Sequence, residues 1–193
     1  AGVRRVFIVA GEASGDKLGK AVMSGLKSLL PDVEFAGVGG PLMEAEGLAS
    51  IFPMNELSVM GLAEVLPKYR ALLRRKDEAV TAALAFAPDI LLTIDSPDFC
   101  KRVAKDVRAV NPSIRTIHYV APSVWAWRPK RAAKLAEFTD KVLTLLPFEP
   151  DLMQAAGMEA EFVGHPVVAE PEATSADVAA FRNAHGLDDA PLL

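Results

Sequence analysis

Apolar residues along the chain occur in short, nearly continuous runs separated by stretches of mixed polarity. The runs cover residues 6–10, 35–38, 90–94, 114–120, 142–146 and 161–164. Continuous hydrophobicity over so few residues is typical of strands that are buried on both faces of a parallel sheet. Because helical patterns fill the stretches between the runs, the alternation predicts an α/β fold with a doubly wound parallel sheet.

The first helical pattern directly follows the first apolar run. Apolar residues recur at spacings of three and four from Leu18 to Leu29. Asp16 is the expected N-cap of this helix, and Pro31 is the expected stop.

A second helical pattern, which ends at Pro88, begins inside segment 57–76. This segment is apolar over much of its first half and ends in a cationic cluster. Its apolar residues at helical spacing include Leu62, Val65, Leu66, Leu72 and Leu73, and its cations are Arg70, Arg74, Arg75 and Lys76. An exposed helix of this kind lies in a membrane interface with its cations on anionic headgroups. A core helix with a solvated basic end fits the same pattern, and Gly61 and Pro67 interrupt both.

Composition and charge narrow the class of protein. The chain has 193 residues, of which 51% are hydrophobic and 24% charged, as in an ordinary globular protein. A net charge of -4 argues against non-specific binding of nucleic acid. The single Cys100 excludes an internal disulfide and suits a reducing cytoplasm, and no apolar run approaches the ~18–20 residues of a membrane span. The three histidines and one cysteine lack the spacing of metal ligands, so no metal and no cofactor is expected.

Polar and glycine residues gather where the expected strands end, which is the edge at which open α/β sheets bind ligands. The first such loop, "GEASGD" (11–16), fits neither common phosphate loop, because Gly11 and Gly15 are four apart and an aspartate follows Gly15. Carboxylates and a serine suit hydroxyl groups instead. Glu12, Ser14 and Gly15 are therefore candidate contacts to a sugar.

Two aspartates follow the strand expected at 90–94. Asp95 comes at the tip of this strand, a rigid place from which to aim a carboxylate, and it is the candidate general base. Asp98 lies three residues further on, past Pro97. It fits the start of a helix and is also a candidate substrate contact.

Aromatic and cationic residues follow the next strand in "SVWAWRPKR" (123–131). The faces of tryptophan pack on sugars, and arginine holds phosphate, so Ser123, Trp125 and Arg128 are candidate substrate contacts. One of Trp125 and Trp127 is expected in the core. His165 either lines the same cleft or occupies a turn.

The last part of the chain reads as a linker, a helix ended by Gly186, and the beginning of another strand in "APLL". We therefore expect one domain over 1–166, with 167–193 holding the linker, the helix and the start of a second domain. The chain is then the first part of a longer protein.

Taken in order, these motifs resemble the lipid-A-disaccharide synthase family of glycosyltransferases. The resemblance rests on "VAGEASGD" (9–16), "GVGGPLMEAEG" (37–47), "ELSVMGLAEVL" (56–66), "IDSPDF" (94–99), "IHYVAPSVWAWRPKR" (117–131), "LPFEP" (146–150) and "FVGHP" (162–166). It implies a GT-B type enzyme with two Rossmann-like halves facing across a cleft, of which this chain is the N-terminal one.

The resemblance also implies a reaction. A UDP-2,3-diacylglucosamine donor is joined to 2,3-diacylglucosamine 1-phosphate by inverting transfer, UDP is released, and Asp95 matches the proposed general base. The nucleotide is held mainly by the C-terminal half, so the present chain alone is expected to be inactive. The family is peripheral to the cytoplasmic face of the inner membrane in Gram-negative bacteria.

Two alternatives remain open from the sequence. Another UDP-sugar transferase or a UDP-sugar epimerase would keep the fold, and a lipid- or sugar-binding half-domain would need no catalysis. An exposed apolar surface at Leu62, Val65, Leu66 and Leu72 would favour the lipid enzyme.

Overall fold

The computed structural model describes residue 2 and residues 4–57, 65–121 and 130–187, with no side-chain description at 65–68, 97 and 130–132. Its strands are β1 (Arg5–Ala10), β2 (Glu34–Val38), β3 (Ile90–Ile94), β4 (Arg115–Tyr119), β5 (Lys141–Thr144) and β6 (Ala160–Phe162). They form one six-stranded sheet in the order β2-β1-β3-β4-β5-β6, and every neighbouring pair is parallel. All the strands expected from the apolar runs are confirmed, with ends that differ by one or two residues.

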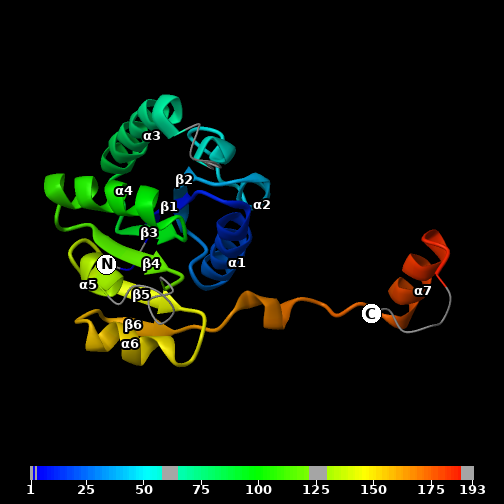
Figure 1. Cartoon of the computed structure of the whole chain (residues 1–193). Coiled ribbons are helices and arrows are strands. Elements are labelled where there is room, and N and C mark those ends of the chain that lie inside the picture. Colours follow the sequence, from blue (N-terminus) through cyan, green and yellow to red (C-terminus); the bar gives the residue numbers. More distant parts are fainter. Residues whose placement is uncertain (1, 3, 58–64, 122–129, 188–193) are drawn as a thin grey trace.

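Helices cover both faces of this sheet (Figure 1). They are α1 (Ala13–Leu29), α2 (Pro41–Ala45), α3 (Val65–Phe86), α4 (Pro97–Val110), α5 (Lys130–Ala136), α6 (Glu149–Ala155) and α7 (Ser175–Ala184), with short 3-10 helices η1 (Met54–Leu57) and η3 (Pro166–Ala169). Side chains of α1 and α2 pack in one core cluster, whereas those of α3, α4, α5 and α6 pack in another. The predicted doubly wound fold is confirmed.

β1 shows why the apolar runs are continuous. Val6, Ile8 and Ala10 belong to the core cluster on one face of the sheet, and Phe7 and Val9 belong to the cluster on the other. All five are at most 1% exposed. Both faces of the strand therefore select apolar side chains.

The N-cap prediction for Asp16 is wrong. α1 begins at Ala13 with Glu12 as its N-cap, so Asp16 lies inside the helix. Its buried carboxylate accepts hydrogen bonds from the backbone N–H groups of Gly40 (2.9 Å), Leu42 (3.0 Å) and Met43 (3.0 Å). Asp16 thus caps α2, a helix more than twenty residues away, and links the first two loops of the functional edge.

α3 is continuous from Val65, so Pro67 does not break it. Pro67 falls in the first turn, where an N–H group would have no partner inside the helix. No helix in the described ranges is both long enough and apolar enough to cross a membrane.

The C-terminal helix lies apart from the sheet. Figure 1 shows α7 at the end of an extended segment that follows β6. The helix begins with a capping box between Thr174 and Asp177 and has no buried residue. Gly186 follows it with φ +61°, which confirms the predicted helix end. The strand expected in "APLL" lies outside the described residues, and the domain boundary at residue 166 stays a prediction.

Candidate functional site

The carboxyl ends of β1 and β3 meet because these two strands are neighbours in the sheet. Their loops are in direct contact, since the Ser14 hydroxyl donates to Asp95 Oδ2 at 3.4 Å. Ser14 is exposed and Asp95 is half-buried. The structure therefore brings together the candidate base and a residue of the acidic loop that the sequence separates by eighty residues.

The tip of β3 has an unusual backbone. Asp95 (φ +49°) and Ser96 (φ +42°) are consecutive non-glycine residues in the left-handed region. Such residues cost about 1 kcal/mol or more each and persist only where their surroundings hold them. Here Asp95 N–H donates to Tyr119 O on β4 (3.1 Å), and Cys100 N–H donates to Ser96 O in α4 (3.0 Å). The conformation turns the Asp95 carboxylate toward the β1–α1 loop.

The glycines of the "GEASGD" loop serve close packing. A Cβ at Gly11 would lie 2.4 Å from Ser96 Oγ and 3.0 Å from Ser96 Cβ, so a larger residue there would force Ser96 to shift. Gly15 is buried, and a Cβ there would lie 3.3 Å from the Ala10 Cβ and 3.5 Å from the Ile94 carbonyl oxygen. Gly11 therefore lies against the β3–α4 turn, and Gly15 lies against the ends of β1 and β3.

The remaining acidic candidates lie at helix N-termini. Glu12 is the exposed N-cap of α1, two residues before Ser14, and its side chain makes no capping bond. Asp98 is exposed in the first turn of α4, where a negative charge complements the helix dipole. Asp98 also lines a hollow between α3 and α4.

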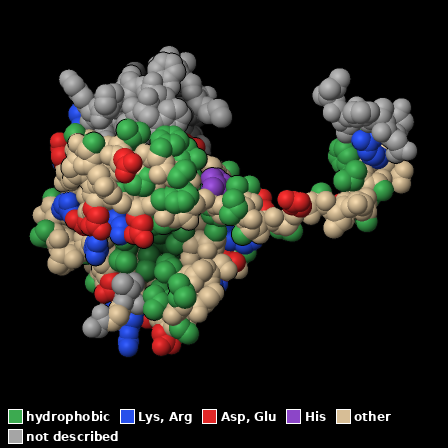
Figure 2. Space-filling view, turned by 90° about the horizontal axis from the view of Figure 1, so that it is seen from below, with side chains coloured by type: hydrophobic (Ala, Val, Ile, Leu, Met, Phe, Trp, Pro, Cys, Tyr) green, Lys and Arg blue, Asp and Glu red, His purple; other side chains and the backbone are tan. Residues whose placement is uncertain are grey.

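His165 occupies a turn at the start of η3. It is exposed, and its Nδ1 accepts from the Val167 N–H at 3.1 Å. The chain after β5 exposes large hydrophobic side chains, which include Leu146, Phe148, Leu152, Phe162, Val163, Val167 and Val168. Figure 2 shows hydrophobic side chains gathered on the face seen from below.

Several predicted residues lie outside the described ranges or side chains. Ser123, Trp125, Arg128 and Leu62 are among the residues that the structure does not describe, and the side chains of Val65 and Leu66 are not described either. Their roles stay predictions.

The two remaining membrane-interface candidates lie on α3. Leu72 is half-buried and packs against the core cluster under α3 and α4, whereas Leu73 lines the hollow between these helices. Leu72 therefore points inward, as the core-helix interpretation expects.

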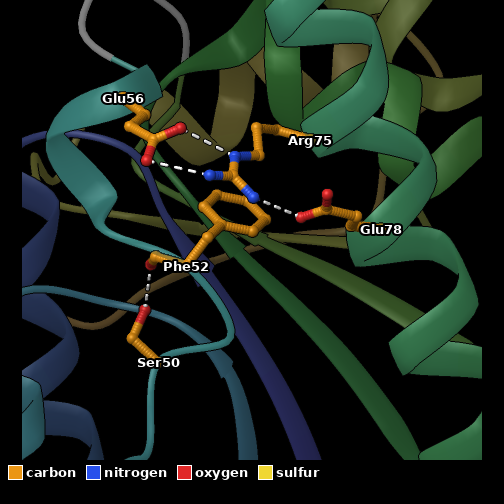
Figure 3. Close-up of polar contacts among 5 residues, drawn as sticks. All are labelled: Ser50, Phe52, Glu56, Arg75 and Glu78. Carbon is orange, nitrogen blue, oxygen red and sulfur yellow. Dashed lines mark hydrogen bonds and ion pairs between the residues drawn. The ribbon is translucent and has the colours of Figure 1, made fainter.

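Arg75, one of the four cations of the expected cluster, is already paired. Arg75 binds both carboxylate oxygens of Glu56, at 2.7 and 2.9 Å, and Glu78 at 2.6 Å, and its guanidinium lies 4.9 Å from the centre of the Phe52 ring (Figure 3). These bonds lower the pKa of Glu56. The bonds between Arg75 and Glu56 connect α3 to η1, the two elements that flank segment 58–64 in sequence.

Two buried titratable groups near the edge were not singled out from the sequence. His118 is buried, and its Nδ1 lies 2.8 Å from Thr93 Oγ1 on the neighbouring strand. Burial lowers the His118 pKa to about 4, so the ring is neutral. Burial, with a smaller contribution from the Asp95 charge, raises the pKa of Cys100 far above its usual range, so Cys100 stays a thiol behind the β3 tip. The burial of His118 follows from the register of β4, and that of Cys100 follows from the packing of α4 on the ends of β1 and β3, so the sequence marked neither.

Sequence relatives cover nearly the whole chain. The model of the lipid-A-disaccharide synthetase family matches residues 6–192. A lipid-A-disaccharide synthase from Ruegeria pomeroyi is 65% identical over 98% of this chain and 47% of its own length. One from Pseudomonas fluorescens is 50% identical over 98% of this chain and 50% of its own length. The chain thus spans about half the length of the relatives it matches.

Solved structures share the fold at low identity. HepE from Anabaena, in complex with UDP and glucose, matches 96% of this chain and 50% of its own with a TM-score of 0.55 and 11% identity. UGT73P12 from Glycyrrhiza uralensis, complexed with glycyrrhetinic acid 3-O-monoglucuronide, matches 95% of this chain and 55% of its own with a TM-score of 0.57 and 12% identity. UDP-GlcNAc 2-epimerase from Neisseria meningitidis gives a TM-score of 0.54 at 10% identity over 86% of this chain and 46% of its own.

At such identities these likenesses show the fold alone, which is that of a Rossmann-like half of a GT-B glycosyltransferase. The family follows from the sequence, since the family model and relatives at up to 65% identity cover almost every residue. The chain belongs to the lipid-A-disaccharide synthase family.

Proposed function

We propose that this chain is the acceptor side of a glycosyltransferase that makes the lipid A disaccharide. The enzyme joins UDP-2,3-diacylglucosamine to 2,3-diacylglucosamine 1-phosphate and releases UDP. Family membership over residues 6–192 supports this activity. The observation that carries the assignment of the base is the strained strand tip that holds the Asp95 carboxylate against Ser14.

The chemistry needs one proton acceptor on this side of the cleft. The 6-hydroxyl of the acceptor attacks the anomeric carbon of the donor from the face opposite UDP, so the new bond forms as the bond to UDP breaks and the configuration inverts. Asp95 takes the hydroxyl proton as the nucleophile forms its bond, a contribution of typically ~10²- to 10⁴-fold. The Ser14 hydroxyl keeps the carboxylate oriented, and Glu12 is placed to bind a sugar hydroxyl.

We assign the binding site of the UDP-linked donor to the part of the relatives that this chain does not span. UDP carries two phosphates whose charge must be stabilised as it leaves. We assign the main contacts to UDP to that second half, with Arg128 as a further candidate on this chain. The present chain alone is therefore expected to lack turnover.

Both proposed substrates carry acyl chains, so we expect the enzyme to bind them at a membrane surface. We assign the surface contact to the segment around Leu62, Val65, Leu66 and Leu73, at the cytoplasmic face of the inner membrane in a Gram-negative bacterium. Leu72 is left out because it packs against the core. Failure of the full-length enzyme to sediment with phospholipid vesicles would remove this part of the proposal.

The test of the base is Asp95→Asn in the full-length enzyme. We expect kcat to fall by ~10²- to 10⁴-fold while the acceptor Kd changes by no more than about threefold, because the amide keeps the shape and loses the basicity. Asp32→Asn, at an exposed site far from the edge, is the matched control. Retained turnover in Asp95→Asn would exclude Asp95 as the base.

A further inference from the structure

A hollow of about 390 Å³ lies between α3 and α4. Figure 1 shows these two helices on the face of the sheet opposite α1 and α2. It is lined by Leu73, Lys76, Asp98, Lys101, Arg102, Lys105 and Asp106. Apart from Asp98 at its end, none of these residues belongs to the candidate site around Asp95. The hollow therefore needs an explanation of its own.

The hollow is electropositive although the protein carries a net charge of -4. The acidic residue Asp106 is engaged, because it binds Lys76 at 2.5 Å, and Lys76 also binds Asp77 at 2.6 Å. Among the described residues, no carboxylate lies within ion-pair distance of Lys101, Arg102 or Lys105. Among the described residues that line the hollow, Asp98 is the one carboxylate besides Asp106.

Aromatic rings hold two of the cations without neutralising them. The Arg102 guanidinium lies 5.7 Å from the centre of the Tyr69 ring, and the Lys101 ammonium lies 5.6 Å from that of Phe138. A cation–π contact restricts a long side chain. Arg102 Nη1 also donates to the Tyr69 hydroxyl at 3.5 Å, and the guanidinium keeps further N–H donors for an anion. Leu73 adds an apolar patch beside these donors.

We propose that this hollow is a phosphate-binding site separate from the Asp95 centre. All three of Lys101, Arg102 and Lys105 line the hollow from little more than one turn of α4. A guanidinium beside ammonium groups matches phosphate oxygens. The phosphate is either free or part of an anionic lipid headgroup, for which Leu73 would contact the apolar part. The proposal does not depend on the glycosyl transfer.

The first test titrates the 193-residue chain with inorganic phosphate at low ionic strength and follows the backbone amides by NMR. We expect millimolar affinity, with the largest shifts in residues 98–106 and 73–76, because exposed charge-assisted bonds are individually weak. Lys101→Gln with Lys105→Gln should weaken binding by about tenfold or more. The control pair, Lys20→Gln with Lys134→Gln, removes the same charge at exposed sites on α1 and α5 and should change it by less than about twofold.

The second test uses vesicles of phosphatidylcholine with and without phosphatidylglycerol. Loss of vesicle binding in the Lys101/Lys105 pair but not in the control pair identifies a lipid headgroup as the source, and loss of inorganic phosphate binding alone identifies free phosphate. Asp106→Asn should strengthen binding of whichever ligand binds, because it releases Lys76. Equal effects of the two lysine pairs, or no binding of either ligand by a chain with normal circular dichroism, would overturn the proposal.

Discussion

At the scale of single residues, the three carboxylates of Asp95, Asp16 and Glu12 near one edge of the sheet have different structural environments. The sequence alone predicts these environments only in part. Asp95 could be singled out because it follows an apolar strand directly, and strand tips are rigid. Asp16 could not be assigned, because its three N–H donors come from residues 40–43 and only the folded chain brings them close. Glu12 took the N-cap position instead. Local spacing therefore identifies the position of a carboxylate more reliably than its partner.

The capping bonds of Asp16 predict a stability effect. Asp16→Asn removes the charge at the α2 N-terminus and turns an amide N–H₂ toward a donor, so a buried N–H loses its acceptor. We expect a loss of roughly 1–3 kcal/mol in the free energy of unfolding, measured by urea denaturation. Asp32→Asn should stay within about 0.5 kcal/mol of the parent. An unchanged midpoint for Asp16→Asn would show that the cap contributes nothing.

The buried His118 predicts how stability depends on pH. Its pKa is lowered from 6.5 to about 4 by burial, so between these values the unfolded chain binds a proton that the native chain does not. The contribution of the neutral ring is therefore full above pH 6.5, declines as the pH falls, and is lost completely below about pH 4. Between about pH 7 and pH 5 the loss amounts to roughly 2 kcal/mol. His118→Gln should remove this part of the slope in urea denaturation at several pH values, and equal slopes would contradict it.

At the scale of elements, the sequence predicts the strands better than the junctions between them. Runs such as 6–10 and 90–94 are buried on both faces, so hydrophobicity alone locates them. The pair of left-handed residues at Asp95 and Ser96 carries no such signal, because neither residue is glycine. The interruption expected at Pro67 did not occur, since a proline in the first turn of α3 costs no hydrogen bond. Junctions depend on contacts between loops, and these are distant in sequence.

The contact between the β1–α1 and β3–α4 junctions predicts a rescue. Gly11→Ala places a Cβ 2.4 Å from Ser96 Oγ and should destabilise the protein by roughly 1–3 kcal/mol. Ser96→Gly alone should gain about 1 kcal/mol, because glycine adopts the left-handed conformation without strain. The double variant removes the clashing side chain and should recover most of the loss in urea denaturation. If the two effects simply add, the junctions are not coupled.

At the scale of the whole molecule, the described chain exposes apolar surface where a second half is expected. Leu152 (41%), Phe162 (48%) and Val168 (87%) are exposed on α6, the edge strand β6 and η3. Figure 2 shows hydrophobic side chains gathered on one face, and contiguous apolar surface marks an interaction site. The relatives are about twice as long as this chain, so the remaining half of such a protein is the proposed cover. Single-sequence periodicity predicts which residues are apolar, but it does not show which of them another domain covers.

The proposed placement of the acceptor site on this chain and of the UDP site on the second half predicts how the isolated chain binds ligands. In detergent, the 193-residue chain should bind the diacylglucosamine 1-phosphate acceptor and show no saturable binding of UDP. In the proposed function the acidic loop faces the sugar, and its carboxylates would repel a diphosphate. Isothermal titration with each ligand measures this, and Asp95→Asn should bind the acceptor within about threefold of the parent. Tight UDP binding would contradict the division and place nucleotide contacts on this sheet edge. Binding of neither ligand would mean that the acceptor site forms only when both halves close the cleft, and adding the C-terminal half in trans should then restore it.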